Sequence, residues 1–275
     1  MPLLRLLVWN CSGRLHDKLS DLTDLAPDVA VLPECACPEV LLRRIRPCVL
    51  GARDLLWDGT HPSRGMLLVT FGPWRARLAP QHRARAASTL PVCLSGPADL
   101  RLVAVWARPP RPEVGHRSGP EPLREALARL LPSLDSPAIL AGDFNRTLVG
   151  EGGLQADLSA AGFVSAYHHV RGVAPGSERE PTFYRLRRYP SRHHLDHVLV
   201  DAATVARLRA VEIRHSARWS AWSDHAPMLV ELEIPTSTQQ QVTPPSALAS
   251  SEASTGRTSN PAEASRSAVR GCSEG

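Results

Sequence analysis

Short apolar runs, each next to a small polar residue, recur five times along the chain. The runs are LLRLLVW, VAVLP, AILAG, HVLV and APMLVEL. Runs of this length, bounded by Pro or Gly, predict buried strands rather than helices. The polar residues are Asn10, Glu34 and Asp143, which follow their runs, and Asp196 and the pair Asp224-His225, which precede theirs.

Strands of opposite direction would bring all five polar ends to one edge of the fold. Asn145, two residues beyond Asp143, would join them there. Carboxylates and amides with one imidazole are the hard donors that Mg²⁺ or Mn²⁺ prefers, whereas zinc would want more His or Cys. The pattern therefore predicts a divalent-metal site. Taken alone, Asp143-Phe144-Asn145 is more typical of an Asx turn, in which Asp143 only caps the backbone.

Helical and strand-like segments alternate between these runs, which predicts α/β layers. Apolar residues at helical spacing favour helices, and apolar runs separated by SGPAD favour a hairpin. A polar loop, DGTHPSRG, should join two further strands, and a long loop, 171–181, is of the kind that often covers a site. The expected helices are 15–25, 38–45, 121–131 and 153–161, and the expected further strands are 54–57, 66–71, 90–94, 100–106 and 182–185.

Composition bounds the domain organisation. The chain has 275 residues, 43% of them hydrophobic, which is enough for one large core. From Pro235 onward Ser, Thr, Pro, Ala and Gln dominate and the apolar periodicity ends. We therefore expect a catalytic domain over residues 1–234 and a disordered tail over 235–275.

Charge points to the class of partner. The formal net charge is +5, and it comes almost wholly from arginine because Lys18 is the only lysine. A basic surface suits phosphate-bearing partners such as nucleic acid. Arginine in place of lysine, with abundant Ala and Pro, is typical of a GC-rich bacterial genome.

The N-terminal segment MPLLRLLVWN favours a first strand over a signal peptide, because Arg5 interrupts it and no small-residue cleavage site follows. A cytoplasmic monomer is the resulting expectation. No apolar run approaches the ~20 residues of a membrane span. The six cysteines should then be reduced thiols. Cys35 and Cys37 with Cys48 could hold a metal, but a fourth ligand is missing nearby.

Five segments, LLVWN, LPE, AGDFN, HLDHVL and SDHAP, in this order and at these spacings, resemble the signatures of the endonuclease/exonuclease/phosphatase superfamily. Exonuclease III, abasic-site endonucleases, neutral sphingomyelinases and inositol-phosphate phosphatases belong to it. The resemblance covers nearly all of residues 3–234, and FVSAYHHV, EPTFYR and HHLDH resemble a bacterial branch with no settled substrate. It implies a four-layer α/β sandwich, with two mixed β-sheets packed face to face and helices on the outside.

The resemblance also implies roles for the residues at the strand ends. Asp143 would be the general base, and Asn145 would orient the attacking water and contact the phosphate. His225, held by Asp196, would place positive charge against the non-bridging oxygens. In-line attack on a phosphodiester needs these elements: a positioned water, a cation and a preorganised donor.

The metal ligands implied by the resemblance are Glu34 as principal ligand, with Asn10 and Asp224 in or near the metal shell. Two departures argue against classical abasic-site specificity. Abasic-site endonucleases have an aspartate where this chain has Ser12, and the family usually has His or Tyr where it has Trp106. An indole donates one hydrogen bond but cannot act as acid or base.

Candidate substrate-binding residues flank these segments. Trp106 could contact phosphate or stack on a substrate ring, and a half-buried core role is equally compatible with the sequence. Arg192 closes a run of arginines that reads equally as solvated surface or as a phosphate contact. His194 precedes Asp196 at the same edge. For His168 and His169, which follow a tyrosine at the end of an apolar strand, structural or rim roles are favoured over metal ligation.

The sequence thus predicts a phosphodiesterase that depends on Mg²⁺ or Mn²⁺, with a DNA or RNA nuclease favoured. A lipid or small-molecule phosphatase of the phosphoinositide or sphingomyelin type is the alternative on the same fold. A non-catalytic phosphate-binding module is the second alternative, although the acidic set it would have lost is present. The substrate and the choice of endo or exo action are not fixed by the sequence.

Overall fold

The first strand of the chain pairs with segments from both ends of the sequence. In the computed structural model, β1 (Leu3–Val8) lies antiparallel to β14 (Met228–Glu233) and parallel to β2 (Val29–Cys35). The structure describes residues 2–45, 50–83, 88–108, 122–185 and 192–234. The six-stranded sheet built on this pairing has the order β13 (Leu208–Ile213), β14, β1, β2, β4 (Arg64–Thr70), β3 (Asp54–His61).

A second six-stranded sheet contains the strand that ends in Asp143, namely β8 (Ala138–Asp143). This strand runs parallel to β7 (Leu100–Trp106) and antiparallel to β12 (Asp196–Asp201). The order of the sheet is β5 (Arg75–Leu78), β6 (Thr89–Ser95), β7, β8, β12, β9 (Phe163–Ser165). Both sheets are mixed, as the family resemblance implies.

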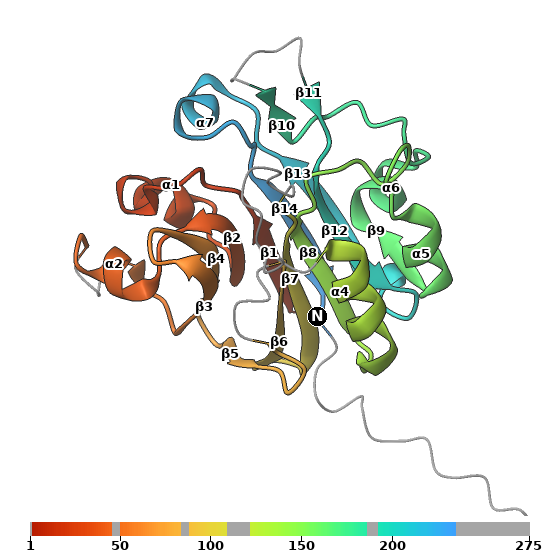
Figure 1. Cartoon of the computed structure of the whole chain (residues 1–275), viewed down its shortest axis with the longest axis horizontal. Coiled ribbons are helices and arrows are strands. Elements are labelled where there is room, and N and C mark those ends of the chain that lie inside the picture. Colours follow the sequence, from red (N-terminus) through yellow and green to blue (C-terminus); the bar gives the residue numbers. More distant parts are fainter. Residues whose placement is uncertain (1, 46–49, 84–87, 109–121, 186–191, 235–275) are drawn as a thin grey trace, which may run out of the picture. The chain divides into compact units, whose positions relative to one another are not determined.

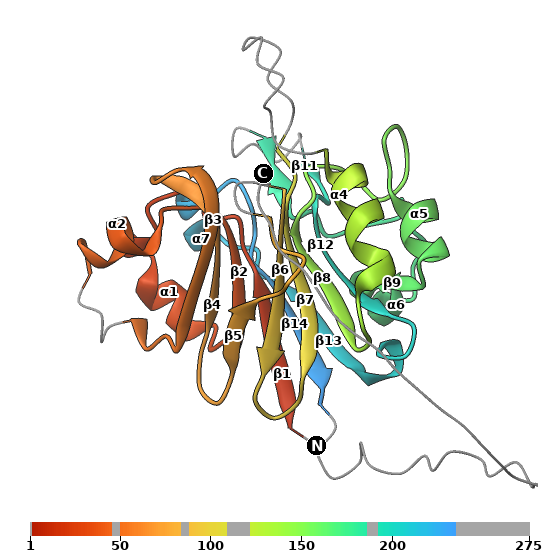
Figure 2. The same cartoon turned by 60° about the horizontal axis from the view of Figure 1, so that its bottom comes forward.

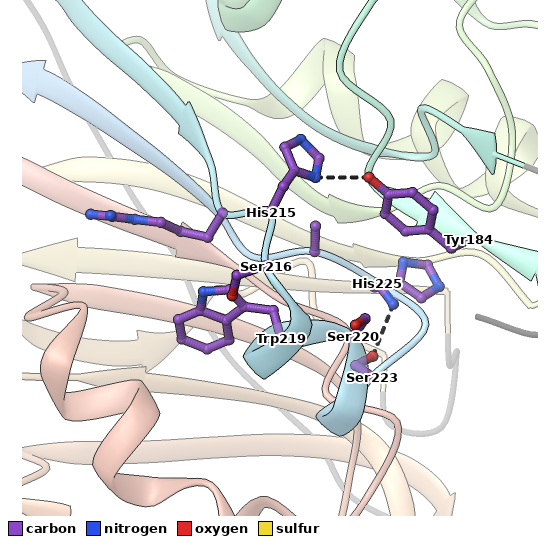
Figure 3. Close-up of a pocket in the computed structure, with 9 residues that line it drawn as sticks. Tyr184, His215, Ser216, Trp219, Ser220, Ser223 and His225 are labelled. Carbon is purple, nitrogen blue, oxygen red and sulfur yellow. Dashed lines mark hydrogen bonds between the residues drawn. The ribbon is translucent and has the colours of Figure 1, made fainter. Parts of the chain in front are cut away.

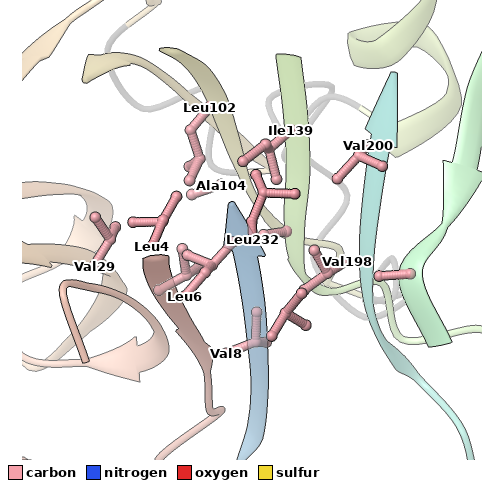
Figure 4. Packing of buried hydrophobic residues seen from close by; sticks show 14 of the residues in the cluster. Leu4, Leu6, Val8, Val29, Leu102, Ala104, Ile139, Val198, Val200 and Leu232 are labelled. Atoms are coloured by element: carbon pink, nitrogen blue, oxygen red, sulfur yellow. The ribbon is translucent and has the colours of Figure 1, made fainter. Parts of the chain in front are cut away.

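The main core lies between the two sheets (Figure 4). Alternate residues of β1, among them Leu4 and Leu6, meet Leu102 and Ile139 of the second sheet. Alternation follows from the pleat, because successive side chains of a strand point to opposite faces. Each fully buried Leu or Ile stabilises the fold by roughly 1.5–3 kcal/mol relative to exposure. This shared core fixes the two sheets face to face.

Helices cover the outer faces of both sheets (Figures 1 and 2). On the first sheet they bury Leu22, Leu41 and Trp219 against β-strand residues. On the second sheet Leu123, Leu127 and Leu158 do the same. The structure is therefore the predicted four-layer α/β sandwich. The covering elements are η1 (Leu15–Asp17), α1 (Leu19–Asp24), α2 (Pro38–Leu42) and α7 (Ala217–Trp222) on the first sheet, and α4 (Leu123–Leu130), η2 (Leu131–Ser133) and α5 (Gln155–Ala160) on the second.

Several local expectations are wrong. The predicted loop 58–65 is mostly strand, because β3 and β4 stay paired as far as His61 and Arg64. The predicted strand 182–185 does not join either large sheet: β10 (Phe183–Tyr184) pairs with β11 (Arg192–His193) in a two-stranded sheet of its own.

His168 and His169 lie on a helix, α6 (Ala166–Arg171), and not at a strand end. The predicted apolar strand stops at Ser165, where β9 ends against β12. His168 is hydrogen-bonded to Ser165 and to Glu178, so it ties the helix to the loop that follows it. That contact supports the structural role. The remaining short helix is η4 (Val205–Arg207).

The tail 235–275, Cys48, Cys272 and much of the arginine run before Arg192 lie outside the described residues. The domain boundary at residue 234 therefore stays a prediction. The described cysteines, Cys11, Cys35, Cys37 and Cys93, are free thiols, as expected. Among the described residues, no helix has the length and apolar character that a membrane crossing requires.

Candidate active site

Strand register brings the polar strand ends together. Asp196, the first residue of β12, lies directly opposite Asp143, the last residue of β8. Trp106 ends the neighbouring parallel strand at the same level. Gly142 permits β8 to lie close to β7, because a Cβ at this position would lie 1.9 Å from the carbonyl oxygen of Val105. Of the five predicted strand ends, those of β8 and β12 thus lie opposite each other, with the end of β7 beside them.

Asp143 is the acceptor at the centre of a hydrogen-bonded polar cluster. The Asn10 Nδ2 donates to its Oδ2 at 2.9 Å, from the segment after β1. Asn145 donates twice, through its backbone N–H to Oδ1 at 2.8 Å and through Nδ2 to Oδ2 at 3.0 Å. Asn145 adopts a left-handed backbone conformation, with φ of 50°, which asparagine tolerates better than most residues. The predicted Asx turn is therefore part of the site, because the hydrogen bonds that form the turn also hold Asp143 and Asn145 in the cluster.

His225 lies between two fully buried carboxylates. Its Nδ1 donates to Asp196 Oδ2 at 2.7 Å, and its Nε2 lies 3.8 Å from Asp143 Oδ2. Ser223 holds the segment before β14 against Asn10, because its hydroxyl donates to the Asn10 carbonyl and accepts the His225 backbone N–H. We call Asn10, Asp143, Asn145, Asp196 and His225 the Asp143 cluster; it contains five of the predicted site residues.

Burial and charge shift the protonation of this cluster. Burial raises the pKa of Asp143 to about 7; the attraction of His225 opposes the rise and the repulsion of Asp196 adds to it. Burial alone would lower the pKa of His225, but attraction to Asp196 and Asp143 outweighs it and raises that pKa to about 10. At neutral pH an imidazolium therefore stands beside a carboxyl group poised to exchange a proton.

The two carboxylates of the cluster are oxygen donors of the kind that a divalent cation prefers. Asp143, Asp196 and His225 each offer a ligand atom, and these atoms all lie within 4.8 Å of one another. The Asp196 Oδ1 is buried and has no hydrogen-bond partner among the described residues. A protonated His225 cannot ligate a metal through Nε2, so the carboxylate oxygens are the donors that suit a hard cation here.

The other predicted metal ligands lie apart from this group. Glu34, near the end of β2, has a left-handed backbone with φ of 60°, and its Oε2 lies 2.7 Å from Nη2 of Arg64 on β4. Asp224 accepts the Tyr184 N–H through its backbone carbonyl, and its charge contributes to the raised pKa of His225. Their assignment as metal ligands stays a prediction.

Trp106 is a core residue with a charged neighbourhood. It is buried in the inter-sheet core, and two guanidinium groups lie over its ring. The Cζ of Arg64 is 5.7 Å from the ring centre, and that of Arg108 is 5.0 Å from it. Sequence reasoning missed both arginines, because Arg64 sits in the segment read as a polar loop and Arg108 carries no motif.

Arg192 and His194 line a cavity of about 390 Å³, together with Thr147 and Arg179. Thr147 follows Asn145 by two residues in the chain. His194 is buried, and its Nδ1 is hydrogen-bonded to the Glu180 carbonyl. Burial lowers its pKa, which leaves it neutral at pH 7.

A second cavity, of about 340 Å³, reaches His225 itself (Figure 3). Tyr184 and His215 line one side and are hydrogen-bonded to each other at 2.8 Å. Trp219 of α7 lines another side, and its ring packs edge-on against Trp9 at 5.3 Å. Trp219 is mostly buried by this packing and also contributes to the lining of the cavity.

Comparisons with known proteins identify the family and the fold. The family model described as "Endonuclease/Exonuclease/phosphatase family" matches residues 7–225. No curated protein matches the chain.

Two solved structures share the fold. The endonuclease domain of TRAS1, a telomere-specific non-LTR retrotransposon, superposes with a TM-score of 0.60 at 14% identity, over 84% of this chain and 98% of that one. A variant of the 3′ phosphatase NExo from Neisseria, bound to a product DNA hairpin, gives a TM-score of 0.56 at 17% identity, over 84% and 100%. The matched family segment contains every residue of the Asp143 cluster. The chain therefore belongs to the Endonuclease/Exonuclease/phosphatase family, whose enzymes hydrolyse phosphate esters.

Proposed function

We propose that this protein is a divalent-metal-dependent phosphodiesterase that cleaves DNA or RNA by in-line attack of water. The observation that carries the proposal is the pairing of Asp143 with His225. A buried carboxyl with a pKa near 7 can accept a proton at neutral pH, and an imidazolium 3.8 Å away can oppose negative charge. These are the two protein groups that phosphodiester hydrolysis needs most.

In the proposed reaction Asp143 removes a proton from the attacking water. Asn145, whose Nδ2 and backbone N–H both point at Asp143, holds that carboxylate in position and orients the water. His225 faces the phosphoryl oxygens, where negative charge grows in the transition state, and Asp196 keeps the imidazole oriented and charged. Preorganisation of this kind lowers the barrier because the groups need not reorient during the reaction.

We assign Glu34 with Asn10 and Asp224 to hold the metal ion. Asn10 is hydrogen-bonded to Asp143, and Asp224 adjoins His225 in the chain. Glu34 follows Pro33, whose carbonyl accepts the N–H of Cys11, the residue after Asn10. When bound, Mg²⁺ or Mn²⁺ would act as a Lewis acid on a phosphoryl oxygen. In the structure the Glu34 carboxylate is neutralised by Arg64 and remains 21% exposed. Its exposure makes it reachable from solvent, unlike the fully buried Asp143 and Asp196.

Nucleic acid is the substrate class that we favour. The two structural neighbours are an endonuclease domain and a 3′ phosphatase bound to a DNA hairpin. Arg179 and Arg192 line the cavity beside Thr147, and a sequence pI near 9.1 favours a polyanion. Arg192 and His194, which line this cavity, are our candidate substrate contacts, whereas Trp106 is buried in the core.

A substrate panel tests the proposal. Purified protein with Mg²⁺ or Mn²⁺ is offered single- and double-stranded DNA, RNA, a phosphoinositide and sphingomyelin, with Asp143→Asn as the inactive control. We expect cleavage of nucleic acid by the wild type and not by the variant. Turnover confined to the lipids would replace the nuclease proposal by the lipid phosphodiesterase. No turnover of any phosphate ester would contradict both.

A further inference from the structure

We propose that Arg64 is a phosphate-binding residue that exchanges partners, pairing with Glu34 in the free protein and with a phosphoryl oxygen of the bound strand. The inference rests on the proposed function, and it assigns to that site a cation that neither the sequence pattern nor the family match identifies.

Arg64 lies between the proposed metal ligand Glu34 and Trp106, whose strand β7 is next to the strand of the proposed base. It is the first residue of β4 and pairs with His61 at the end of the β3–β4 hairpin. Its Nη2 lies 2.7 Å from Glu34 Oε2, and its Cζ lies 5.7 Å from the ring centre of Trp106. Because Trp106 is in register with Asp143, one guanidinium borders both halves of the site.

The pairing with Glu34 is suited to exchange. The Arg64 side chain is 50% exposed, and ion pairs of such exposure contribute little to stability. A divalent cation on Glu34 would repel the guanidinium and compete for the same oxygen. The ring of Trp106 would then keep the released guanidinium nearby through its cation–π contact.

Arg64 would also supply a positive charge that the residue at position 106 cannot provide. An indole at position 106 offers no proton for the reaction and no charge. A guanidinium matches two phosphate oxygens with two parallel N–H donors, which a lone ammonium does not. Arg64 would thus bring positive charge to the strand end where Trp106 stands.

Exchange of partners predicts changes of opposite sign. In Arg64→Gln, Mn²⁺ should bind about 2- to 5-fold more tightly, because its competitor for Glu34 is gone. Binding of a fluorescein-labelled oligodeoxynucleotide in saturating Mn²⁺ should weaken about 10-fold or more, because a charge-assisted contact to phosphate is lost. Arg64→Lys keeps the positive charge but not the two parallel N–H donors. Its affinity for the oligonucleotide should therefore lie between those of the wild type and Arg64→Gln.

The test measures Mn²⁺ binding by titration calorimetry, and oligonucleotide binding by fluorescence anisotropy in an Asp143→Asn background that prevents cleavage. Arg75→Gln is the matched control, because Arg75 is similarly exposed and pairs with Asp54 at 3.3 Å on strands of the same molecule. We expect the control to change neither constant. Thermal melting verifies that each variant is folded.

Opposite shifts in the Arg64→Gln protein support the exchange. The exchange is overturned if the affinities of Arg64→Gln for Mn²⁺ and for the oligonucleotide are both unchanged or are both weakened. A purely structural arginine would give one of these two results. If the wild type cleaves nucleic acid while Arg64→Gln binds it equally well, only this inference fails. A wild type that binds neither Mn²⁺ nor the oligonucleotide overturns the proposed function as well.

Discussion

Asp196→Asn should destabilise the protein in a way that depends on pH. The raised pKa of His225, from 6.5 to about 10, corresponds to roughly 5 kcal/mol in favour of the buried imidazolium. Asp196 is the larger of the attractive contributions and Asp143 the next, so the loss of Asp196 should cost on the order of a few kcal/mol. For a folded unit of this size, such a loss lowers the melting temperature by roughly 5–10 °C.

The sign of the pH dependence follows from the direction of the shift. A pKa raised on folding contributes stability that is fully present below 6.5, the value in the unfolded chain, and lost as pH rises through about 10. The gap in melting temperature between wild type and Asp196→Asn should therefore be widest near pH 6 and should shrink above pH 9. Calorimetry at pH 6, 8 and 10 measures it.

Asp201→Asn is a matched control on the same strand. The Asp201 Oδ2 accepts hydrogen bonds from the Ser136 hydroxyl and the Ala138 backbone N–H, neither of which titrates in this range. This variant should lower the melting temperature by an amount that stays constant between pH 6 and 10. A gap for Asp196→Asn that is equally constant would refute our description of His225 as an imidazolium held by Asp196.

Three further predictions concern catalysis. Asp143→Asn should lower kcat by about 10²–10⁴ while an oligonucleotide still binds, as single-turnover assays and anisotropy would reveal; a modest loss in kcat would exclude Asp143 as the base. Glu34→Gln should raise the Mn²⁺ concentration that gives the half-maximal rate, and an unchanged metal titration would remove Glu34 from the metal shell. The logarithm of kcat/KM should rise with pH through about 7 as Asp143 loses its proton and fall through about 10 as His225 does; a flat profile between pH 5 and 9 would contradict these roles.

The sequence predicts the positions of the strand ends because a small polar residue beside a short apolar run marks the edge of a sheet. Asp143 and Asp196 fall opposite each other in the structure, and Asn10 and His225 reach them through hydrogen bonds. Asp143 and Asp196 become neighbours only because β8 and β12 pair in antiparallel fashion. From the sequence alone, this pairing had to be assumed. The shared edge could therefore be predicted, but the distances within it could not.

Arg64 shows why the rest could not be predicted. Its contact with Glu34 depends on how far the β3–β4 pairing continues, and the polar segment 58–65 carries no apolar alternation to reveal it. The same holds for Tyr184 and His215, which are hydrogen-bonded on one side of a cavity. Tyr184 comes from a two-residue strand and His215 from a short loop. Such contacts arise from tertiary packing and leave no local pattern in the sequence.

Cleavage of a labelled oligonucleotide by the purified protein, followed with Mg²⁺, with EDTA, and with Mg²⁺ restored, tests the proposed activity most directly. We predict cleavage that stops in EDTA and returns with Mg²⁺, and cleavage by Asp143→Asn that is about 10²–10⁴ slower than that of the wild type in Mg²⁺. Cleavage that persists in EDTA would contradict the metal requirement. Equal cleavage by Asp143→Asn would contradict the role assigned to the Asp143 cluster.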